Sequence, residues 1–334
     1  MGMVLTKSAI LFGAMVAAFG IILPGPSKAT PLEREPLVLG IAENGGDIPT
    51  LIALEQGFYR DEGLDVTTKS WPAGKMALEA LLRDEVEVAT VADTPLVLQS
   101  FKRQDFVIIA TFSHNTPYRL VADLNDRIAS PTDLRGHRVG VMAGTTAQFF
   151  LHSVLADLGI APSEIIEVNV PADESADALV SDRVDAIAAF DPQGYFAQVA
   201  LGSRAQLIPY EKGRHEETFN YATRRGFSKS RPRAAERLMR ATNRAIEWAH
   251  THREEAIALI AHRLKIDMPM LSSSWDNYRH ALTLDQVLII SLESQARWAI
   301  RNNIGGGTKV PNYLNYLDTT PLDAVLPSAV TIIR

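Results

Sequence analysis

The sequence predicts an α/β fold with two parallel-sheet lobes of similar build, joined by a two-strand hinge and followed by a helical C-terminal tail. Three observations favour this fold. Short apolar strands alternate with amphipathic helices, this alternation occurs twice along the chain, and from about residue 230 apolar residues recur at helical spacing instead. The length of 334 residues allows one large domain or two ordinary ones.

The N-terminus is predicted to be a secretory signal peptide, residues 1–29, and no part of the fold. Lys7 provides a short positive region, residues 8–23 are almost wholly apolar, and a Pro-Gly-Pro break leads to a small-residue cleavage site. A membrane anchor is the alternative, but the apolar run is slightly short for a membrane span. We therefore expect a soluble, exported mature protein that starts near Thr30.

The most informative feature is an internal repeat at an offset of about 98 to 100 residues. Residues 80–89 (ALLRDEVEVA) correspond to residues 178–187 (ALVSDRVDAI), and each stretch indicates the end of a helix, a polar turn and an apolar strand. Each copy then reaches an aspartate followed closely by proline. The earlier strands, 37–42 and 138–142, both lead to glycine-containing turns. Such units make parallel sheets with right-handed crossovers, so the repeat predicts two lobes built alike.

The tail is predicted to be helical throughout. Helices are expected over residues 232–264, 270–278 and 283–301, with a short one over 310–318.

The chain is expected to cross between the lobes twice, near residues 118–123 and 208–219. Lobe 1 would then be discontinuous and comprise residues 36–119 and 220–334, whereas lobe 2 would comprise residues 120–219. Two crossing strands make a hinge that can close on a ligand.

The composition excludes several classes of function. The net charge of -6 argues against nucleic acid and anionic membranes as partners. Cysteine is absent, which excludes disulfides, thiolate zinc sites and a cysteine nucleophile. The eight histidines are scattered, and HEETF at 215–219 ends in Phe219 where a zinc helix needs histidine. Nucleophile-elbow, Ser-x-x-Lys and Walker motifs are also missing, so we expect no metal, no cofactor and no enzymatic activity.

The best candidate for ligand contact is the turn Gly144, Thr145 and Thr146, which follows a predicted strand. Glycine permits a tight turn, two hydroxyls can donate, and the following helix presents N–H groups that suit an anion. A plain threonine helix cap is the alternative role. In open α/β sheets ligands bind beyond the carboxyl ends of the strands, and here two such edges would face each other.

Other candidates follow the ends of the remaining strands. They are Asn44, Gly45 and Gly46 in the first turn, Thr94, Ser113 and His114 after later strands of lobe 1, and Asp191 in lobe 2. Asp93 is expected to be a helix cap, with Thr94 beside it as the ligand contact, because an aspartate followed by proline commonly starts a helix. Asp191 has the same two possible roles, ligand contact or cap.

With these elements placed, the chain resembles the solute-binding proteins of nitrate, sulfonate and taurine importers. The phrases that carry the resemblance occur in order at residues 54–66, 80–95, 130–141, 185–192 and 310–314. The resemblance implies the type II periplasmic-binding-protein fold, a periplasmic location, and an ABC permease with a cytoplasmic ATPase as partners. Phe190 stands where the family usually has tryptophan, a departure at the pocket wall, so the resemblance does not identify the individual ligand.

The resemblance implies that a monomer captures a small anionic or zwitterionic molecule, such as a sulfonate, taurine or nitrate, between its lobes. A similar Gly-Thr-Thr turn meets the ligand carboxylate in periplasmic amino-acid-binding proteins, and an aspartate like Asp191 meets the amine. Two other functions remain open. One is a ligand sensor for a membrane receptor, and the less favoured one is an enzyme of thiamine-pyrimidine synthesis, which relies on a cysteine cluster absent here.

Overall fold

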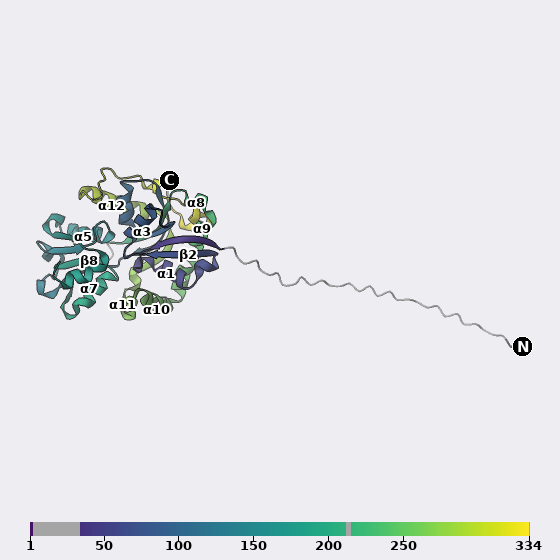
Figure 1. Ribbon diagram of the computed structural model, residues 1–334, viewed down its shortest axis with the longest axis horizontal. Helices are drawn as coiled ribbons and strands as arrows, with labels where there is room; N and C mark the ends of the chain where they lie inside the picture. Colours follow the sequence, from purple (N-terminus) through teal and green to yellow (C-terminus); the bar gives the residue numbers. More distant parts are fainter. Residues whose placement is uncertain (3–33, 212–214, 334) are drawn as a thin grey trace. The chain divides into compact units, whose positions relative to one another are not determined.

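A computed structural model describes residues 1–2, 34–211 and 215–333 (Figure 1). The expected signal peptide, apart from its first two residues, lies outside the described residues. Among the described residues, we find no helix with the length and apolar character needed to span a bilayer. The described residues from Arg34 onward belong to one compact unit, which contains two β-sheets.

The first sheet has six strands in the order β11-β4-β10-β3-β1-β2. In chain order these are β1 (Glu35–Ile41), β2 (Leu64–Ser70), β3 (Val88–Ala92), β4 (Phe106–Asn115), β10 (Glu217–Arg224) and β11 (Tyr278–Thr283). β1 pairs in parallel with β2 and β3, whereas β10 runs antiparallel to both β3 and β4. β11 closes the edge antiparallel to β4.

The second sheet has five strands in the order β7-β6-β8-β5-β9. They are β5 (Tyr118–Asp123), β6 (Arg138–Val141), β7 (Ile166–Asn169), β8 (Ala186–Phe190) and β9 (Ala205–Leu207). β6 is parallel to β7 and β8, and β5 is antiparallel to β8 and β9. Both sheets are therefore mixed and not purely parallel as expected, because the strands that carry the chain between them, β5 and β10, enter from the opposite direction.

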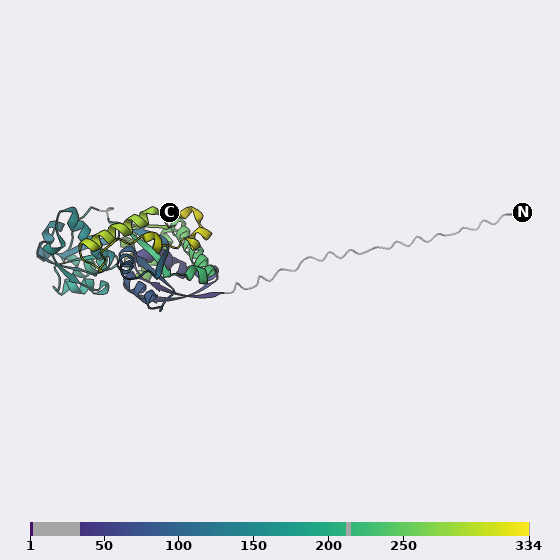
Figure 2. The same cartoon turned by 90° about the horizontal axis from the view of Figure 1, so that it is seen from above.

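Helices cover both sheets (Figure 1). The first half contributes α1 (Ile48–Glu55), α2 (Phe58–Asp61), α3 (Gly74–Leu82) and α4 (Asp93–Ser100), and the second contributes α5 (Thr146–Asp157), α6 (Ser175–Val180) and α7 (Gln193–Leu201). The tail adds α8 (Phe227–Ser230), α9 (Pro232–Thr251), α10 (Arg253–Leu264), α11 (Met268–Ser274), α12 (Gln286–Arg301) and α13 (Thr320–Val325). Figure 2 shows α12 and its neighbours in green to yellow, beside the teal second half.

The internal repeat is visible in the local geometry of both halves. Asp84 and Asp182, at matching positions, adopt φ of 59° and 55° in the turn before β3 and β8, a left-handed conformation that aspartate tolerates. Glu87 then accepts a hydrogen bond from the Val38 backbone N–H at 3.0 Å. Its counterpart Asp185 accepts one from the equivalent strand residue, Arg138, at 2.7 Å. Matching carboxylates therefore tie the first strand of each half to the third.

The tail departs from the prediction between the two helices expected over 270–278 and 283–301, where residues 278–283 form the unpredicted strand β11. Burial alternates there, with Tyr278, His280 and Leu282 buried between more exposed residues, which is the period of a strand. The free edge of β4 supplies the hydrogen-bonding partners of this strand. α12 accordingly starts later than expected, capped by Asp285, whose side chain accepts from the Leu288 N–H at 3.1 Å.

Candidate functional site

A small cavity lies where the carboxyl ends of β1, β3, β6 and β8 face one another. Its lining comes from both sheets and consists of Asn44, Ala73, Gly74, Lys75, Ala92, Pro95, Thr145, Thr146, Phe190, Glu217 and Phe219. The cavity volume is about 20 Å³, which is room for about one water molecule. A larger ligand can therefore enter only when the two sheets move apart, so the structure shows a closed arrangement.

The donors on one side of the cavity are Lys75, Thr145 and Thr146. Lys75 Nζ donates to the carbonyl oxygen of Ala143 at 2.9 Å, which joins α3 of the first half to the turn before α5. Thr145 Oγ1 donates to the Met142 carbonyl at 2.7 Å. These groups and the N-terminus of α5 place a cation and partial positive charge at one end of the cavity, an arrangement that suits an anion.

The turn itself is held in place by side chains behind it. Gly144, at φ +73°, donates its N–H to Gln148 Oε1 at 2.8 Å. Gln148 Nε2 in turn donates to Glu167 Oε1 at 2.6 Å, and His152 Nε2 lies 2.6 Å from the other Glu167 oxygen. Burial opposes ionisation of Glu167, but its hydrogen bonds with His152 and Gln148 outweigh this effect and lower its pKa. The turn is thus supported from β7 as well as from its own helix.

Trp298 of α12 extends this chain of hydrogen bonds to the tail. Its Nε1–H donates to His152 Nδ1 at 3.2 Å. Because an indole nitrogen only donates, Nδ1 accepts and Nε2 carries the proton directed at Glu167. A tail helix packed against α4 of the first half is therefore connected to the turn of the second half.

Asp93 is fully buried, and it accepts hydrogen bonds from other elements as well as from its own helix. It accepts from the Thr94 N–H at 3.0 Å and from Ser291 Oγ of α12 at 3.1 Å. The Thr218 N–H of β10 and Thr146 Oγ1 of α5 approach it at 3.4 Å. Burial raises its pKa, and these neutral donors oppose the rise. Asp93 was expected to be a helix cap only; it instead joins four elements from both halves.

Glu217, the first residue of β10, is the second buried carboxyl group at the cavity. It is 4% exposed and lines the cavity directly. Tyr118 Oη donates to its Oε2 at 2.7 Å. Burial raises the pKa of Glu217 to about 8, and the charge of the nearby Asp93 raises it further. The side chains of Tyr118 and Asn115 favour the ionised form and offset only part of this rise.

Gly45 and Gly46 admit aromatic rings beside the first turn. A Cβ on Gly45 would lie 2.4 Å from the Tyr278 ring, and one on Gly46 would lie 2.4 Å from the Phe219 ring. Asn44 lines the cavity, and its Oδ1 accepts from the Gly46 N–H at 2.9 Å. The glycines therefore shape the wall, and the polar group of this turn at the cavity is that of Asn44.

Three other candidates are buried beside the cavity lining without belonging to it. Thr94 Oγ1 donates to Gln295 of α12. Ser113 Oγ donates to Asn115 Oδ1 at 2.6 Å, and His114 Nδ1 lies 2.7 Å from Glu216 Oε1. The structure brings Asn44, Thr145 and Thr146 together, but it gives Thr94, Ser113 and His114 partners inside the protein.

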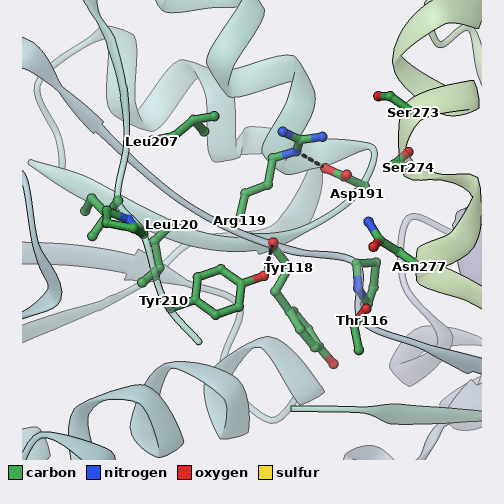
Figure 3. A pocket seen from close by; sticks show the side chains of 13 residues that line it. Thr116, Tyr118, Arg119, Leu120, Asp191, Leu207, Tyr210, Ser273, Ser274 and Asn277 are labelled. Atoms are coloured by element: carbon green, nitrogen blue, oxygen red, sulfur yellow. Dashed lines mark hydrogen bonds and ion pairs between the residues drawn. The ribbon is translucent and has the colours of Figure 1, made fainter. Parts of the chain in front are cut away.

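Asp191 lies in a different and larger hollow of about 440 Å³ beside the hinge (Figure 3). Arg119 Nε donates to Asp191 Oδ1 at 2.7 Å, and the Tyr195 N–H donates to the same oxygen at 3.1 Å. Tyr210, Ser273, Ser274 and Asn277 add polar groups to this hollow. Asp191 is thus an ion-pair partner and a helix cap, whereas Thr145 and Thr146 line the smaller cavity.

Sequence reasoning missed Lys75, Glu217 and Phe219. Lys75 stands one residue after the first residue of a helix that follows a strand, a position that faces the same sheet edge as the predicted turns. Glu217 and Phe219 belong to the HEETF run that was considered only as an incomplete zinc motif. Acidic residues at the start of an apolar strand that returns through the hinge were the available signal.

The model of the family described as "NMT1/THI5 like" matches residues 44–256. A relative from Escherichia coli, provisionally named an aliphatic sulfonates-binding protein, is 24% identical over 257 residues, which are 75% of this chain and 78% of the relative. A provisionally named binding protein of Brucella abortus is 22% identical over 256 residues, 74% of this chain and 77% of its own length.

Solved structures share the fold at low identity. The periplasmic aliphatic sulphonate binding protein SsuA of Escherichia coli superimposes with a TM-score of 0.71 at 18% identity, covering 85% of this chain and 98% of its own. The alkanesulfonate-binding protein SsuA of Xanthomonas axonopodis, bound to MOPS, gives 0.73 at 17% identity over 89% and 98%. The desulfurization enzyme DszB gives 0.70 at 16% identity over 88% and 99%. These similarities confirm the predicted periplasmic-binding-protein fold.

Proposed function

The chain belongs to the NMT1/THI5-like family, and from that premise we propose that it is the substrate-binding component of an ATP-driven importer. It captures a small anionic or zwitterionic molecule of the sulfonate class and delivers it to a membrane permease served by a cytoplasmic ATPase. The observation that carries the proposal is the cavity whose donors come from both halves, Lys75 from one and Thr145 and Thr146 from the other. Only closure of the two halves brings these groups together.

The relatives support the sulfonate class. The matching proteins of Escherichia coli and Bacillus subtilis are both named for aliphatic sulfonates, and two of the similar structures are sulfonate-binding proteins. The predicted signal peptide and the periplasmic location of SsuA of Escherichia coli support export of this chain to the periplasm, where it would work as a monomer. Uptake of the ligand by cells with and without the chain would separate transport from sensing.

Binding without turnover is the function we favour over catalysis. The enzyme DszB has the same fold, and one of its structures is a cysteine-to-serine mutant in complex with a sulfinic acid. The present chain has no cysteine among its 334 residues. A bound ligand should therefore be recovered chemically unchanged, which mass spectrometry of the released compound after prolonged incubation would test.

Calorimetric titration of the mature protein with ethanesulfonate, MOPS, taurine and nitrate tests the binding function. At least one sulfonate should bind saturably at one site, and Lys75→Ala and Thr145→Ala should each weaken it by about ten- to a hundredfold. The first removes an ammonium donor, and the second removes a hydroxyl that would turn from the Met142 carbonyl to the bound anion. Lys69→Ala is a matched control, because that lysine donates to the Glu85 carbonyl and is not among the residues that line the cavity. Equal affinity in all four proteins, or no saturable binding of any anion, would overturn the proposal.

A further inference from the structure

The polar side chains at the cavity include both hydrogen-bond donors and carboxyl groups. Lys75, Thr145 and Thr146 are donors, whereas the other polar side chains at or against the cavity include Glu217 and Asp93. A molecule with a single anionic group can use the donors only. The carboxyl groups at the cavity therefore indicate which second functional group the ligand carries.

The two acids differ in how well the protein satisfies them. Asp93 receives hydrogen bonds from Thr94 and Ser291, with two further donors at 3.4 Å. Glu217 receives one from Tyr118. An ionised carboxylate has about four acceptor positions, and buried polar groups are normally satisfied. Glu217 therefore retains acceptor capacity that faces the cavity.

The residue opposite Glu217 has unused capacity as well. Asn115 pairs with Glu217 in the β10–β4 register and is fully buried. Its Nδ2 has no hydrogen-bond partner of good geometry among the described residues, yet it lies close enough to Glu217 to lower the pKa of that carboxyl group. An ionised Glu217 can recruit this amide, so the protein has a donor ready for the charged form of the carboxyl group.

The hydrogen bonds of the nearby basic side chains go to groups other than Glu217. Lys75 donates to the Ala143 carbonyl, and Arg119 pairs with Asp191 in the separate hinge hollow. Where these carboxyl groups are ionised, a plain anion lying across the cavity would place its charge against Glu217 and Asp93, and like charges in a buried site are costly. A cationic donor on the ligand would relieve that cost.

Resting on the proposed function, we infer that the ligand is zwitterionic or amine-bearing, with an ammonium-type donor, and that Glu217 is the residue that recognises this group. The anionic end then lies toward Lys75, Thr145 and Thr146. The role that the sequence suggested for Asp191 belongs to Glu217, which lines the same cavity as the threonines.

The protonation of Glu217 makes the inference testable by pH. Because burial raises the pKa of Glu217 to about 8, the free protein holds this group mostly protonated at pH 7. An ammonium group binds the ionised form, so binding releases a proton. Affinity should therefore rise about tenfold between pH 6.5 and 8.0 and level off above the pKa. A protonated Glu217 that donated to an anion would give the opposite trend.

The experiment uses matched ligand pairs that differ by one amine. Taurine is compared with ethanesulfonate, and β-alanine with propionate, by calorimetry of the mature protein and of Glu217→Gln. In the wild type the amine-bearing member should bind at least tenfold more tightly, and Glu217→Gln should abolish this preference and the pH trend. Glu216→Gln is the control, because that neighbouring carboxylate pairs with His114 and Arg279 outside the cavity lining. Thermal unfolding confirms that each variant folds.

The outcomes separate the inference from the proposed function. If ethanesulfonate binds as tightly as taurine, the function stands and the inference is overturned. If β-alanine shows the preference and neither sulfonate binds, the inference stands and the sulfonate class is wrong. If neither amine-bearing compound binds, or affinity falls as the pH rises, the inference is overturned.

Discussion

Asp93 and Asp191 occupy matching places at the ends of β3 and β8, yet the protein uses them differently. Asp93 is bound by uncharged donors from α4, α5, β10 and α12. Asp191 is bound by the guanidinium of Arg119 and by its own helix, beside an open hollow. The difference arises because α12 of the tail covers the first aspartate, whereas the second faces β5 and the hinge. The same motif, an aspartate followed closely by proline, thus connects several elements by hydrogen bonds in one half and forms an ion pair in the other.

The largest expected effect is the loss of stability when Asp93 is removed. Asp93→Ala should lower the free energy of unfolding by about 2–4 kcal/mol, because it leaves several buried donors without an acceptor. Asp191→Ala should cost about 1–2 kcal/mol, since water in the hinge hollow can solvate Arg119. Urea denaturation of both variants measures the difference. An equal or larger loss for Asp191→Ala would show that the two aspartates are equivalent in the folded protein.

The acid beside Asp93 gives a smaller effect with a definite pH dependence. Glu217 has a pKa of about 8 in the folded protein, above its ordinary value of 4.5, so the folded state binds more protons than the unfolded state between these values. Its contribution is fully present below about pH 4.5 and is lost as the pH rises through 8.

Glu217→Gln should therefore stabilise the ligand-free protein at pH 8 by about 1–3 kcal/mol and have little effect at pH 5. Urea denaturation at both pH values is the measurement, with Glu216→Gln as the control. If Glu217→Gln raises the free energy of unfolding equally at both pH values, the stabilisation comes from packing and not from the removal of an ionisable group.

The smallest effect tests the contribution of the tail. Trp298→Phe removes the hydrogen bond to His152 and should cost about 1 kcal/mol in unfolding free energy. Because that bond joins α12 to α5, the variant should also favour the open form, and small-angle scattering should show a larger radius of gyration without ligand. Trp248→Phe is the control, since that ring stacks on His252 within the tail. An unchanged radius for Trp298→Phe would mean that the bond does not restrain opening.

Local sequence determined much of this protein. The alternation of strands and helices, the repeat at 80–89 and 178–187, and the helices α9 and α10 follow from apolar periodicity and turn residues, which depend on neighbours along the chain. The glycine-threonine turn could be placed at the cavity because strand ends in α/β folds meet at one edge. The sequence stretches that resemble those of solute-binding proteins, taken in order, also predicted the periplasmic-binding-protein fold. Similarity to solved structures confirms this fold.

Only the tertiary structure decided which side chains meet. Residues 278–283 form a strand because β4 offers a free edge. The spacing of apolar residues within 278–283 cannot reveal an edge formed by a distant part of the chain. Asp93 and Asp191 diverge because α12 and Arg119 reach them from distant parts of the chain. Glu217 is brought to the cavity by the second crossing between the sheets. Hydrogen bonding and burial depend on these long-range contacts, so the pattern that predicted the two aspartates could not predict their partners.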